Sequence, residues 1–313
     1  MLFKCLINEK YTDFARKNSR VTIFIYNNST LFYTSLYVRQ HAKPTRFDSA
    51  ESWVILSNIE QRIKAKIEAI GTPLKDWNIQ INYGIKTGFN DAFIINGEKR
   101  AELIAKDPKS AEIIRPILRG RDIKRYGYDF ADLYLINTHN GVKEKGIKRI
   151  HIEDYPAVKA HLDLFYPEIE KRADQGDTPY NLRNCAYIED FYKQKIVWAS
   201  IGETSYSIIP KNTFLLDTNY FFSIKNEQRY LLAILNSKLI TYWINSEDTP
   251  IGNGGAYRHY KYNLERLPIA KISSAIKEKL SNLLDNQNYR EIDKIIYILY
   301  DINEEEILFI EAL

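Results

Sequence analysis

Residues 82–95 read NYGIKTGFNDAFII, in which a polar segment separates two apolar, strand-like runs. Gly84 and Gly88 in this segment permit positive φ angles or a close approach of the backbone to another group. The polar side chains of the segment supply a cation and hydrogen-bonding groups: Lys86, Thr87 and Asn90. Two interpretations are open, a structural hairpin or bulge loop and a loop that contacts a phosphate or a base.

The bulk composition limits the class of protein. With 313 residues, the chain is long enough for two domains or for one large domain with appendages. Hydrophobic residues make up 45% and charged residues 27%, as in an ordinary folded globular protein. No segment reaches the roughly 18 uncharged apolar residues of a membrane span, and the first residues lack the features of an export signal. Cys5 and Cys185 are too few for a disulfide framework or a zinc site, so we expect a cytoplasmic protein with no membrane partner.

Charge and tyrosine content are compatible with a nucleic-acid partner. The net charge of +4 and the pI of 8.7 are only mildly basic, and many proteins without such a partner share them. Many of the 23 tyrosines stand beside Lys or Arg, as in RYGYD, AYRHYKY and DFYKQK. Aromatic rings interleaved with cations suit a surface that contacts phosphates and base edges, although tyrosines also pack at strand edges.

The helix and strand patterns predict an α+β fold with a mixed β-sheet. Two β-rich runs lie within residues 20–39. The polar break that follows contains Asp48 and Ser49, either of which fits the N-cap of a long connecting helix over about 50–70. Apolar residues at three- and four-residue steps give that helix one apolar face, and Gly71 should end it.

The middle of the chain predicts strands mixed with short helices. We expect strands at 77–85, 91–96, 132–138, 195–201, 205–210 and 219–225. We expect helices at 98–107 and 110–118, and a longer helix over 154–172 that is capped by Asp154 and interrupted at Pro167. Trp198 follows the strand pattern and should be a core residue.

The last third predicts a helical tail. A strongly apolar helix covers 230–244, and a glycine-rich loop that we expect to be mobile follows it at 246–262. From residue 271 to the end, the pattern is helical throughout.

Signatures of catalysis are scarce. The sequence has no GxxxxGK[ST] or GxGxxG phosphate-binding loop, no GxSxG elbow and no histidine pair at metal-ligand spacing. His259 is interpreted as a solvated loop residue rather than a base. Asp122 with Lys124 weakly matches a nuclease pair, but Asp122 equally fits an internal ion pair with Arg119. The chain is therefore interpreted as a binding module without a catalytic residue or a metal site.

Five stretches together resemble a known family. GIKTGFNDAFII resembles the G-I-x-T-G-x-N-x-A-F signature of the C-terminal specificity domain of TaqI-like adenine methyltransferases and type IIG restriction–modification enzymes. In the same order as in that family follow IIRPILRGRDIKRY, YPAVKAHLDLFYPEIEKRAD with NLRNCAYIEDFYKQKIVW, AILNSKLITYWI and YNLERLPIA. The final helices resemble those that close the large fused enzymes, and the similarity runs from about residue 50 to the end.

The resemblance implies recognition of double-stranded DNA for a catalytic partner. That partner would be a methyltransferase domain, with a nuclease domain where one is fused, in the same or another chain. This sequence lacks the glycine-rich S-adenosylmethionine motif and the N-P-P-Y or D-P-P-Y tetrad of such enzymes. S-adenosylmethionine and Mg²⁺ are therefore implied for the full enzyme and no cofactor for this chain, to which neither methyl transfer nor cleavage is assigned.

The expected organisation has four parts. They are a β-rich remnant of the end of a methyltransferase domain at 1–48, a connector helix at 49–75, the DNA target-recognition domain at 76–270, and a helical C-terminal region at 271–313.

Three loops are the expected DNA contacts. The predicted contact residues are Lys86, Thr87, Asn90, Arg119, Arg121, Lys124, Arg125, Asn253, Tyr257 and Arg258. The glycines expected to shape these loops are Gly84, Gly88, Gly120, Gly254 and Gly255. Arginine can bind guanine bidentately, and the other cations can contact phosphates and so position the protein on the duplex. For the three loops to contact one duplex, they should line a single groove.

Two alternative functions remain open at this level. A Mg²⁺-dependent nuclease would use Asp122 and nearby acids. A protein-interaction scaffold would turn its tyrosines toward another polypeptide.

Overall fold

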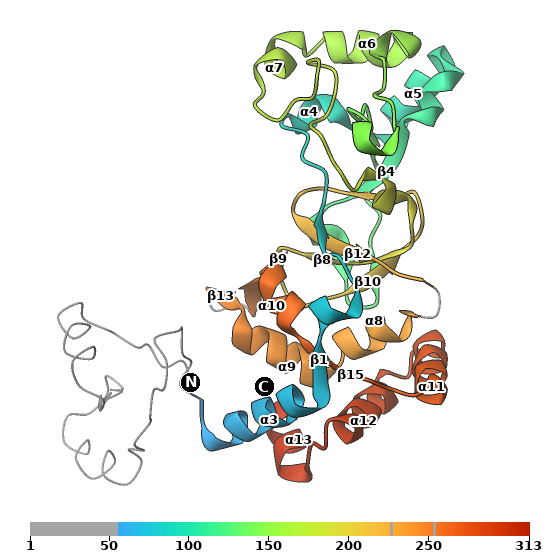
Figure 1. Ribbon diagram of the computed structural model, residues 1–313. Coiled ribbons are helices and arrows are strands. Elements are labelled where there is room, and N and C mark those ends of the chain that lie inside the picture. The colour runs from blue at the N-terminus through green and yellow to red at the C-terminus, as the bar shows by residue number, and fades with distance from the viewer. Residues whose placement is uncertain (1–55, 226–227, 253–254) are drawn as a thin grey trace, which may run out of the picture. The chain divides into compact units, whose positions relative to one another are not determined.

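The computed structural model describes residues 56–225, 228–252 and 255–313 (Figure 1). All of these residues except Leu56 belong to a compact unit that spans Ser57–Leu313. The β-rich runs expected at 20–39 and the helix caps expected at Asp48 and Ser49 lie outside the described residues. Among the described helices, none is long and apolar enough to cross a membrane.

The connecting helix, α3, spans Asn58–Ile70 and begins later than the pattern predicts. Ser57 is its N-cap, and a capping box joins the Ser57 and Glu60 side chains to each other's backbone N–H groups. Ile63 and Ile67 face the core with no exposed surface. The chain then enters β1 (Gly71–Pro73), which pairs antiparallel with β15 (Pro268–Ala270), so the start and the end of the predicted recognition domain lie side by side.

A four-stranded antiparallel sheet lies at the centre of the fold, in the order β10-β8-β12-β2. Its strands are β2 (Asn82–Tyr83), β8 (Lys195–Ala199), β10 (Ser207–Ile209) and β12 (Asn219–Ser223). The three strands predicted between residues 195 and 225 are therefore confirmed. The strand predicted at 77–85 is shorter, because Leu74–Trp77 forms a 3-10 turn, η2.

Alternate residues of this central sheet enter two different cores. On β8, Ile196 and Trp198 pack in one hydrophobic cluster, while Val197 packs in the other. On β12, Phe222 joins the first cluster and Phe221 the second. Successive side chains of a strand point to opposite faces, so the sheet separates the two cores. Trp198 is 2% exposed, which confirms the prediction that it is a core residue.

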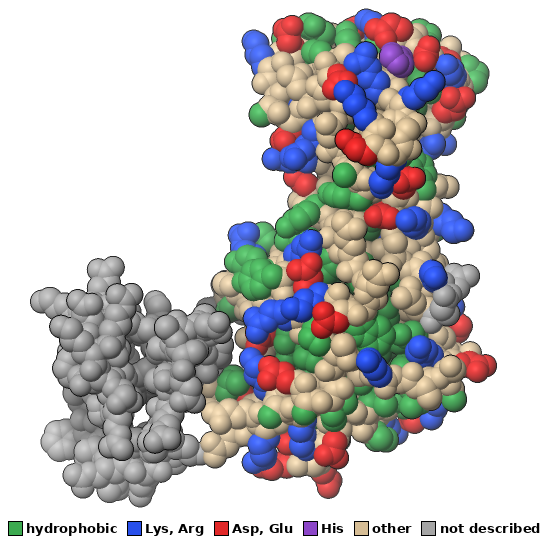
Figure 2. Space-filling model, in the orientation of Figure 1, with side chains coloured by type: hydrophobic (Ala, Val, Ile, Leu, Met, Phe, Trp, Pro, Cys, Tyr) green, Lys and Arg blue, Asp and Glu red, His purple; other side chains and the backbone are tan. Residues whose placement is uncertain are grey.

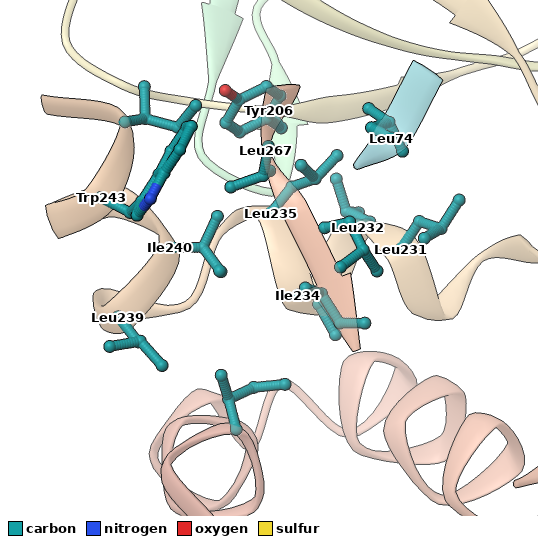
Figure 3. Close-up of a cluster of buried hydrophobic side chains, with 14 of the residues drawn as sticks. Leu74, Tyr206, Leu231, Leu232, Ile234, Leu235, Leu239, Ile240, Trp243 and Leu267 are labelled. Carbon is teal, nitrogen blue, oxygen red and sulfur yellow. The ribbon is translucent and has the colours of Figure 1, made fainter. Parts of the chain in front are cut away.

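Helices cover the first core. They are α8 (Tyr230–Leu235), α9 (Lys238–Glu247), α11 (Ser274–Asp285), α12 (Tyr289–Leu299) and α13 (Glu304–Glu311), together with α3. Figure 3 shows Leu231, Leu235 and Ile240 of α8 and α9 in this core, near Tyr206 and Leu267. The helical tail predicted from residue 271 is confirmed.

The single helix predicted at 230–244 is wrong, because the chain breaks between α8 and α9. Ser237 has extended backbone angles and its hydroxyl accepts from the Ile240 N–H, so it caps a new helix. The Asn236 side chain exchanges two hydrogen bonds with the backbone of Tyr206, at 3.0 Å and 2.9 Å. The Asn-Ser pair thus attaches the helical part of the molecule to the central sheet.

A second sheet, with the order β11-β4-β7-β3, packs in the other core. Its strands are β3 (Ile94–Asn96), β4 (Ile114–Leu118), β7 (Leu133–Ile136) and β11 (Phe214–Leu215). Beside it in Figure 1 lie α4 (Asn90–Phe93), α5 (Gly97–Lys106), α6 (Pro156–Asp163) and α7 (Tyr166–Lys171). The parallel pairing of β11 with β4 and the antiparallel pairing elsewhere make the fold α+β with mixed pairing, as predicted.

Two helix predictions in this region need correction. Residues 110–118 are not helical: they form the end of a 3-10 turn, η3 (Pro108–Glu112), and then β4. The interruption near Pro167 is confirmed, since α6 ends before it and α7 carries it in the first turn. Asp154 caps neither helix, because it lies in a 3-10 turn, η6 (Ile152–Asp154), and Pro156 opens α6.

Two small β-ribbons complete the fold. One is the hairpin of β5 (Ile123–Lys124) and β6 (Gly127–Tyr128). The other has the order β13-β14-β9, with β9 at Ile201–Gly202, β13 at Thr249–Ile251 and β14 at Ala256–Arg258, and α10 (Lys261–Arg266) follows it. The segment expected to be a mobile loop is thus a hairpin that pairs with β9.

Candidate nucleic-acid interface

The turn between β11 and β12, Leu216–Asn219, is called here the central turn. It binds the first predicted loop through the backbone: the Gly84 N–H donates to the Asn219 carbonyl at 3.0 Å, and the Asp217 N–H donates to the Ile85 carbonyl at 3.0 Å. A Cβ atom on Gly84 would lie 1.9 Å from the Leu216 carbonyl oxygen. Glycine is therefore required at position 84 because two backbone segments touch there.

The second predicted loop binds the same turn directly, and the third is connected to it through Ser200. The Gly120 N–H donates to the Thr218 hydroxyl at 3.1 Å. The Ser200 N–H donates to the Thr218 carbonyl at 2.8 Å, and the Ser200 carbonyl accepts from the His259 N–H at 2.9 Å. The loops at 84–90, 119–125 and 249–260 therefore meet around the central turn, and together they are called the three-loop surface.

Two cations of the three-loop surface have no side-chain interaction partner among the described residues. Arg121 and Arg258 are exposed, and within the described part of the chain their side chains make no ion pair or hydrogen bond. In the region of β9 and β13, Figure 2 shows basic side chains among acidic and hydrophobic ones rather than a uniformly basic patch. The two arginines are thus isolated exposed cations in a surface of mixed charge.

Arg119 and Asp122 form a closed ion pair. Arg119 Nη2 lies 2.7 Å from Asp122 Oδ1, and the Arg119 backbone N–H donates to Oδ2 at 2.8 Å. The hydrogen bond to Asp122 raises the pKa of Arg119, and Asp122 is 4% exposed. The predicted internal ion pair is confirmed, and the Asp122 carboxylate is not free to serve a nuclease.

Of the other two cations of this loop, Lys124 binds within the loop and Arg125 binds the helical part of the molecule. Lys124 Nζ donates to the Arg121 carbonyl at 3.2 Å and remains half-exposed. The Arg125 guanidinium donates to the carbonyl of Asn236 and lies 5.4 Å from the centre of the Tyr126 ring. Arg125 thus links the loop to the end of α8.

In the first loop, Thr87 is a predicted contact residue that the structure buries. Its side chain is 2% exposed, and the hydroxyl donates to Asn90 Oδ1 at 2.6 Å. Gly88 has a φ angle of +73°, which favours glycine. Asn90 is exposed at the start of α4. Thr87 therefore supports the loop, which corrects its assignment as a DNA contact, while Asn90 remains accessible.

Lys86 is exposed but paired. Its Nζ lies 2.9 Å from Asp174 Oδ2, and Arg183 Nη1 lies 3.0 Å from Asp174 Oδ1. The hydrogen bond from Lys86 lowers the pKa of Asp174. One carboxylate thus holds two cations from distant parts of the chain beside the three-loop surface.

Two arginines near this loop are absent from the sequence-based predictions. Arg172 is 6% exposed, donates to the Thr87 carbonyl at 2.5 Å and to the Pro179 carbonyl at 3.0 Å, and lies 4.5 Å from the Phe93 ring centre. Burial lowers its pKa to about 10. Arg183 is the other, and the only sequence signal for it is the NLRN segment of the resemblance.

The hairpin supplies the third part of the surface. Asn253 and Gly254 lie outside the described residues. Gly255 has a φ angle of +73°, and Tyr257 is partly buried. The expectation that His259 is a solvated loop residue is wrong, because it is 4% exposed and lies 2.6 Å from Asp248.

A separate hollow of about 670 Å³ lies between the β5–β6 hairpin and the helices α8, α11 and α12. Tyr126, Tyr289, Gln194 and the Arg229–Asp285 ion pair line it, and none of the predicted contact residues does. It is therefore distinct from the three-loop surface.

Comparison with known proteins supplies independent information. The family model of the TaqI-like C-terminal specificity domain matches residues 115–269. No curated protein matches the chain.

Solved structures with a similar fold come from larger enzymes. The type IIL restriction–modification enzyme MmeI in complex with DNA matches with a TM-score of 0.53 and 15% identity, over 75% of this chain and 35% of MmeI. The type IIG restriction endonuclease BpuSI matches with a TM-score of 0.47 and 12% identity, over 79% of this chain and 33% of BpuSI. At these identities the likeness concerns the fold, and the chain spans about a third of each enzyme.

Proposed function

We propose that the chain is the sequence-specific, double-stranded DNA recognition module of a type IIG restriction–modification enzyme, because the family model of the TaqI-like C-terminal specificity domain matches residues 115–269. The observation that carries the proposal is the arrangement of three separate loops around the central turn, two bonded to it directly and the third through Ser200. Among the described residues, the side chains of Arg121 and Arg258 have no ion-pair partner and so could contact DNA. A surface built from three distant segments offers several contacts to one duplex.

The two free arginines and the paired Lys86 have different roles. Arginine binds phosphate or the O6 and N7 atoms of guanine in a bidentate manner, which suits Arg121 and Arg258. Lys86 reaches a phosphate after it leaves Asp174, so its contact costs an ion pair of modest strength at an exposed site. The Arg119–Asp122 pair, Thr87 and Arg172 hold the loops in place.

Catalysis belongs to another part of the proposed enzyme. The sequence contains no N-P-P-Y or D-P-P-Y tetrad, and the described residues contain no group of three His, Cys, Asp or Glu side chains that could hold a metal ion. S-adenosylmethionine and Mg²⁺ would be bound by that other part of the enzyme. The module would grip the duplex while a methyltransferase domain, in the same or a partner chain, receives an extruded adenine.

The domain division remains part of the proposal. Residues 76–270 would recognise DNA, and 49–75 would connect them to a catalytic domain. The remnant of that domain predicted at 1–48 lies outside the described residues. Residues 271–313 would close the first core against α8 and α9, where α11, α12 and α13 pack. A cytoplasmic location, with access to DNA, agrees with this function.

The salt dependence of DNA affinity tests the function. Phosphate contacts release counterions, so log Kd should rise with log salt with a slope of several units, and Arg121→Ala or Arg258→Ala should each reduce the slope by about one if the residue binds phosphate. Lys294→Ala on α12 is the matched control, since Lys294 is exposed and pairs with Glu291. A slope near zero would contradict the proposal and favour a protein-interaction scaffold.

A further inference from the structure

Asp248 and His259 flank the β13–β14 hairpin and form a buried pair. Asp248 directly precedes β13, and His259 directly follows β14. Their side chains are 2% and 4% exposed, and His259 Nδ1 lies 2.6 Å from Asp248 Oδ2. The pair therefore closes the hairpin at its base.

The same two residues bind three neighbouring elements, two through side chains and one through the Asp248 backbone. His259 Nε2 lies 3.2 Å from the Gly202 carbonyl of β9. Asp248 Oδ1 accepts from Asn263 Nδ2 of α10 at 2.7 Å, and the Asp248 N–H donates to the Ile244 carbonyl of α9 at 2.9 Å. The hairpin base is thus attached to α9, to α10 and to β9 through one network.

The outer part of the hairpin has little other support. The three residues of β13 are exposed, and Ile251 is 37% exposed near the tip. Arg258 pairs with Ile201 through its backbone, and its side chain has no hydrogen-bond or ion-pair partner among the residues that the structure describes. Since the hairpin buries few side chains of its own, its position depends on the network at its base.

We propose that His259 and Asp248 are positioning residues that hold Arg258 in place for contact with DNA. This rests on the proposed function, because Arg258 must meet DNA for its position to matter. His259 itself is buried, so it acts through the adjacent arginine. Loss of either residue leaves the other as a buried polar or charged group without its hydrogen-bond partner. This destabilises the base of the hairpin, so that the hairpin opens more often.

The first arm of the test needs no DNA. In the full chain, His259→Leu and Asp248→Asn should speed amide hydrogen exchange of residues 249–258 by roughly tenfold or more, a local opening, while exchange in α12 stays unchanged. Asp293→Asn is the matched control, because Asp293 is also a buried aspartate that accepts a backbone N–H, from Lys238 at 2.8 Å. If His259→Leu fails to fold, Asp248→Asn, which keeps the side-chain shape, decides the result. Unchanged exchange in the hairpin, or equal acceleration in all variants, would overturn the proposal.

The second arm measures DNA affinity in a double-mutant cycle. His259→Leu should weaken binding by about the same factor as Arg258→Ala, and adding it to Arg258→Ala should cost less than about twofold more, because groups that act as a unit are not additive. Full additivity would overturn the positioning role and leave the DNA function standing. Absence of DNA binding by the unmodified chain would overturn both the DNA function and the positioning role. The exchange experiment would still show, without DNA, whether His259 and Asp248 stabilise the hairpin.

Discussion

At the scale of the residue, burial decides what each charged group does. Lys195 has no exposed surface and donates to the carbonyls of Phe191 and Thr213 at 2.9 Å and 3.1 Å. Burial lowers its pKa to about 7 from the ordinary 10.5, because an ammonium group is disfavoured away from water. Arg172 is likewise buried, but it keeps its charge by donating to several carbonyls. Both residues serve the fold, whereas Arg121 and Arg258 are exposed and have no side-chain partner in the described part of the chain, as the proposed contact with DNA requires.

Lys195 predicts a pH dependence of stability. Between about pH 7 and 10.5 the unfolded chain binds a proton at this lysine that the folded chain does not, so the free energy of unfolding rises with pH across that window. Lys195→Met removes this contribution. Urea unfolding at pH 7, 8 and 9 should show the stability of the unmodified chain rising relative to Lys195→Met, by at most about 1.4 kcal/mol per pH unit. Parallel pH profiles for the two proteins would contradict the prediction.

At the scale of the element, the patterns that repeat locally could be predicted from the sequence. The strands at 195–225 have short β-rich runs between turns, and the tail has helical spacing, so both are predicted correctly. The break between α8 and α9 is not predicted, because Ser237 caps α9 while Asn236 binds Tyr206, a residue distant in sequence. The pattern at 110–118 predicts a helix, yet its second half pairs in a sheet with β7 and β11. Long-range partners decide these elements.

In the candidate site, too, local sequence predicts some features, while others depend on tertiary contacts. The three loops could be predicted because glycines and cations mark them, and the Arg119–Asp122 pair was among the alternatives because its members lie three residues apart. The burial of Thr87 and His259 could not be predicted, since their partners' positions depend on the tertiary fold. Sequence thus locates the loops but does not separate supporting side chains from free ones.

The loop that contains Lys86 leads to a prediction about Asp174. Asp174→Asn removes the carboxylate that pairs with Lys86 and Arg183, which frees two cations and removes a negative charge near the expected phosphates. Affinity for a duplex of unrelated sequence should increase several-fold at low salt, because such binding depends on the phosphate backbone. Fluorescence anisotropy would measure this, with Asp285→Asn as control, since Asp285 pairs with Arg229 at the separate hollow. Equal or weaker binding by Asp174→Asn than by the control would refute a phosphate role for Lys86 and Arg183.

The close contact between Gly84 of the first loop and Leu216 of the central turn can be tested by substitution. Gly84→Ala places a methyl group against the Leu216 carbonyl, only 1.9 Å from its oxygen, where no methyl group fits, so β2 must move away from β12. We expect a clear loss of stability, of about 2 kcal/mol, because the backbone must shift to relieve the steric overlap in a packed site. Gly127→Ala is the control, because a Cβ there has no neighbour within 4 Å. Equal melting temperatures for the two variants would mean that the close contact is not required.

At the scale of the whole molecule, the central sheet separates two cores and joins the three loops. Its face toward α8 and α9 packs in the first core, and its other face packs in the second. The turn that leads into β12 binds the loops at 84–90 and 119–125 directly, and it is connected to the hairpin through Ser200. The arrangement explains how segments far apart in the sequence form one surface on a rigid support, as precise recognition of a ligand requires.

The central claim is that this one surface meets DNA, and amide hydrogen exchange with and without a cognate or mixed-sequence duplex tests it most directly. We predict that DNA slows exchange in all three loops together, at 84–90, 119–125 and 249–260, and leaves α12 and α13 unchanged. Protection confined to the helices, or protection of one loop without the other two, would contradict the account.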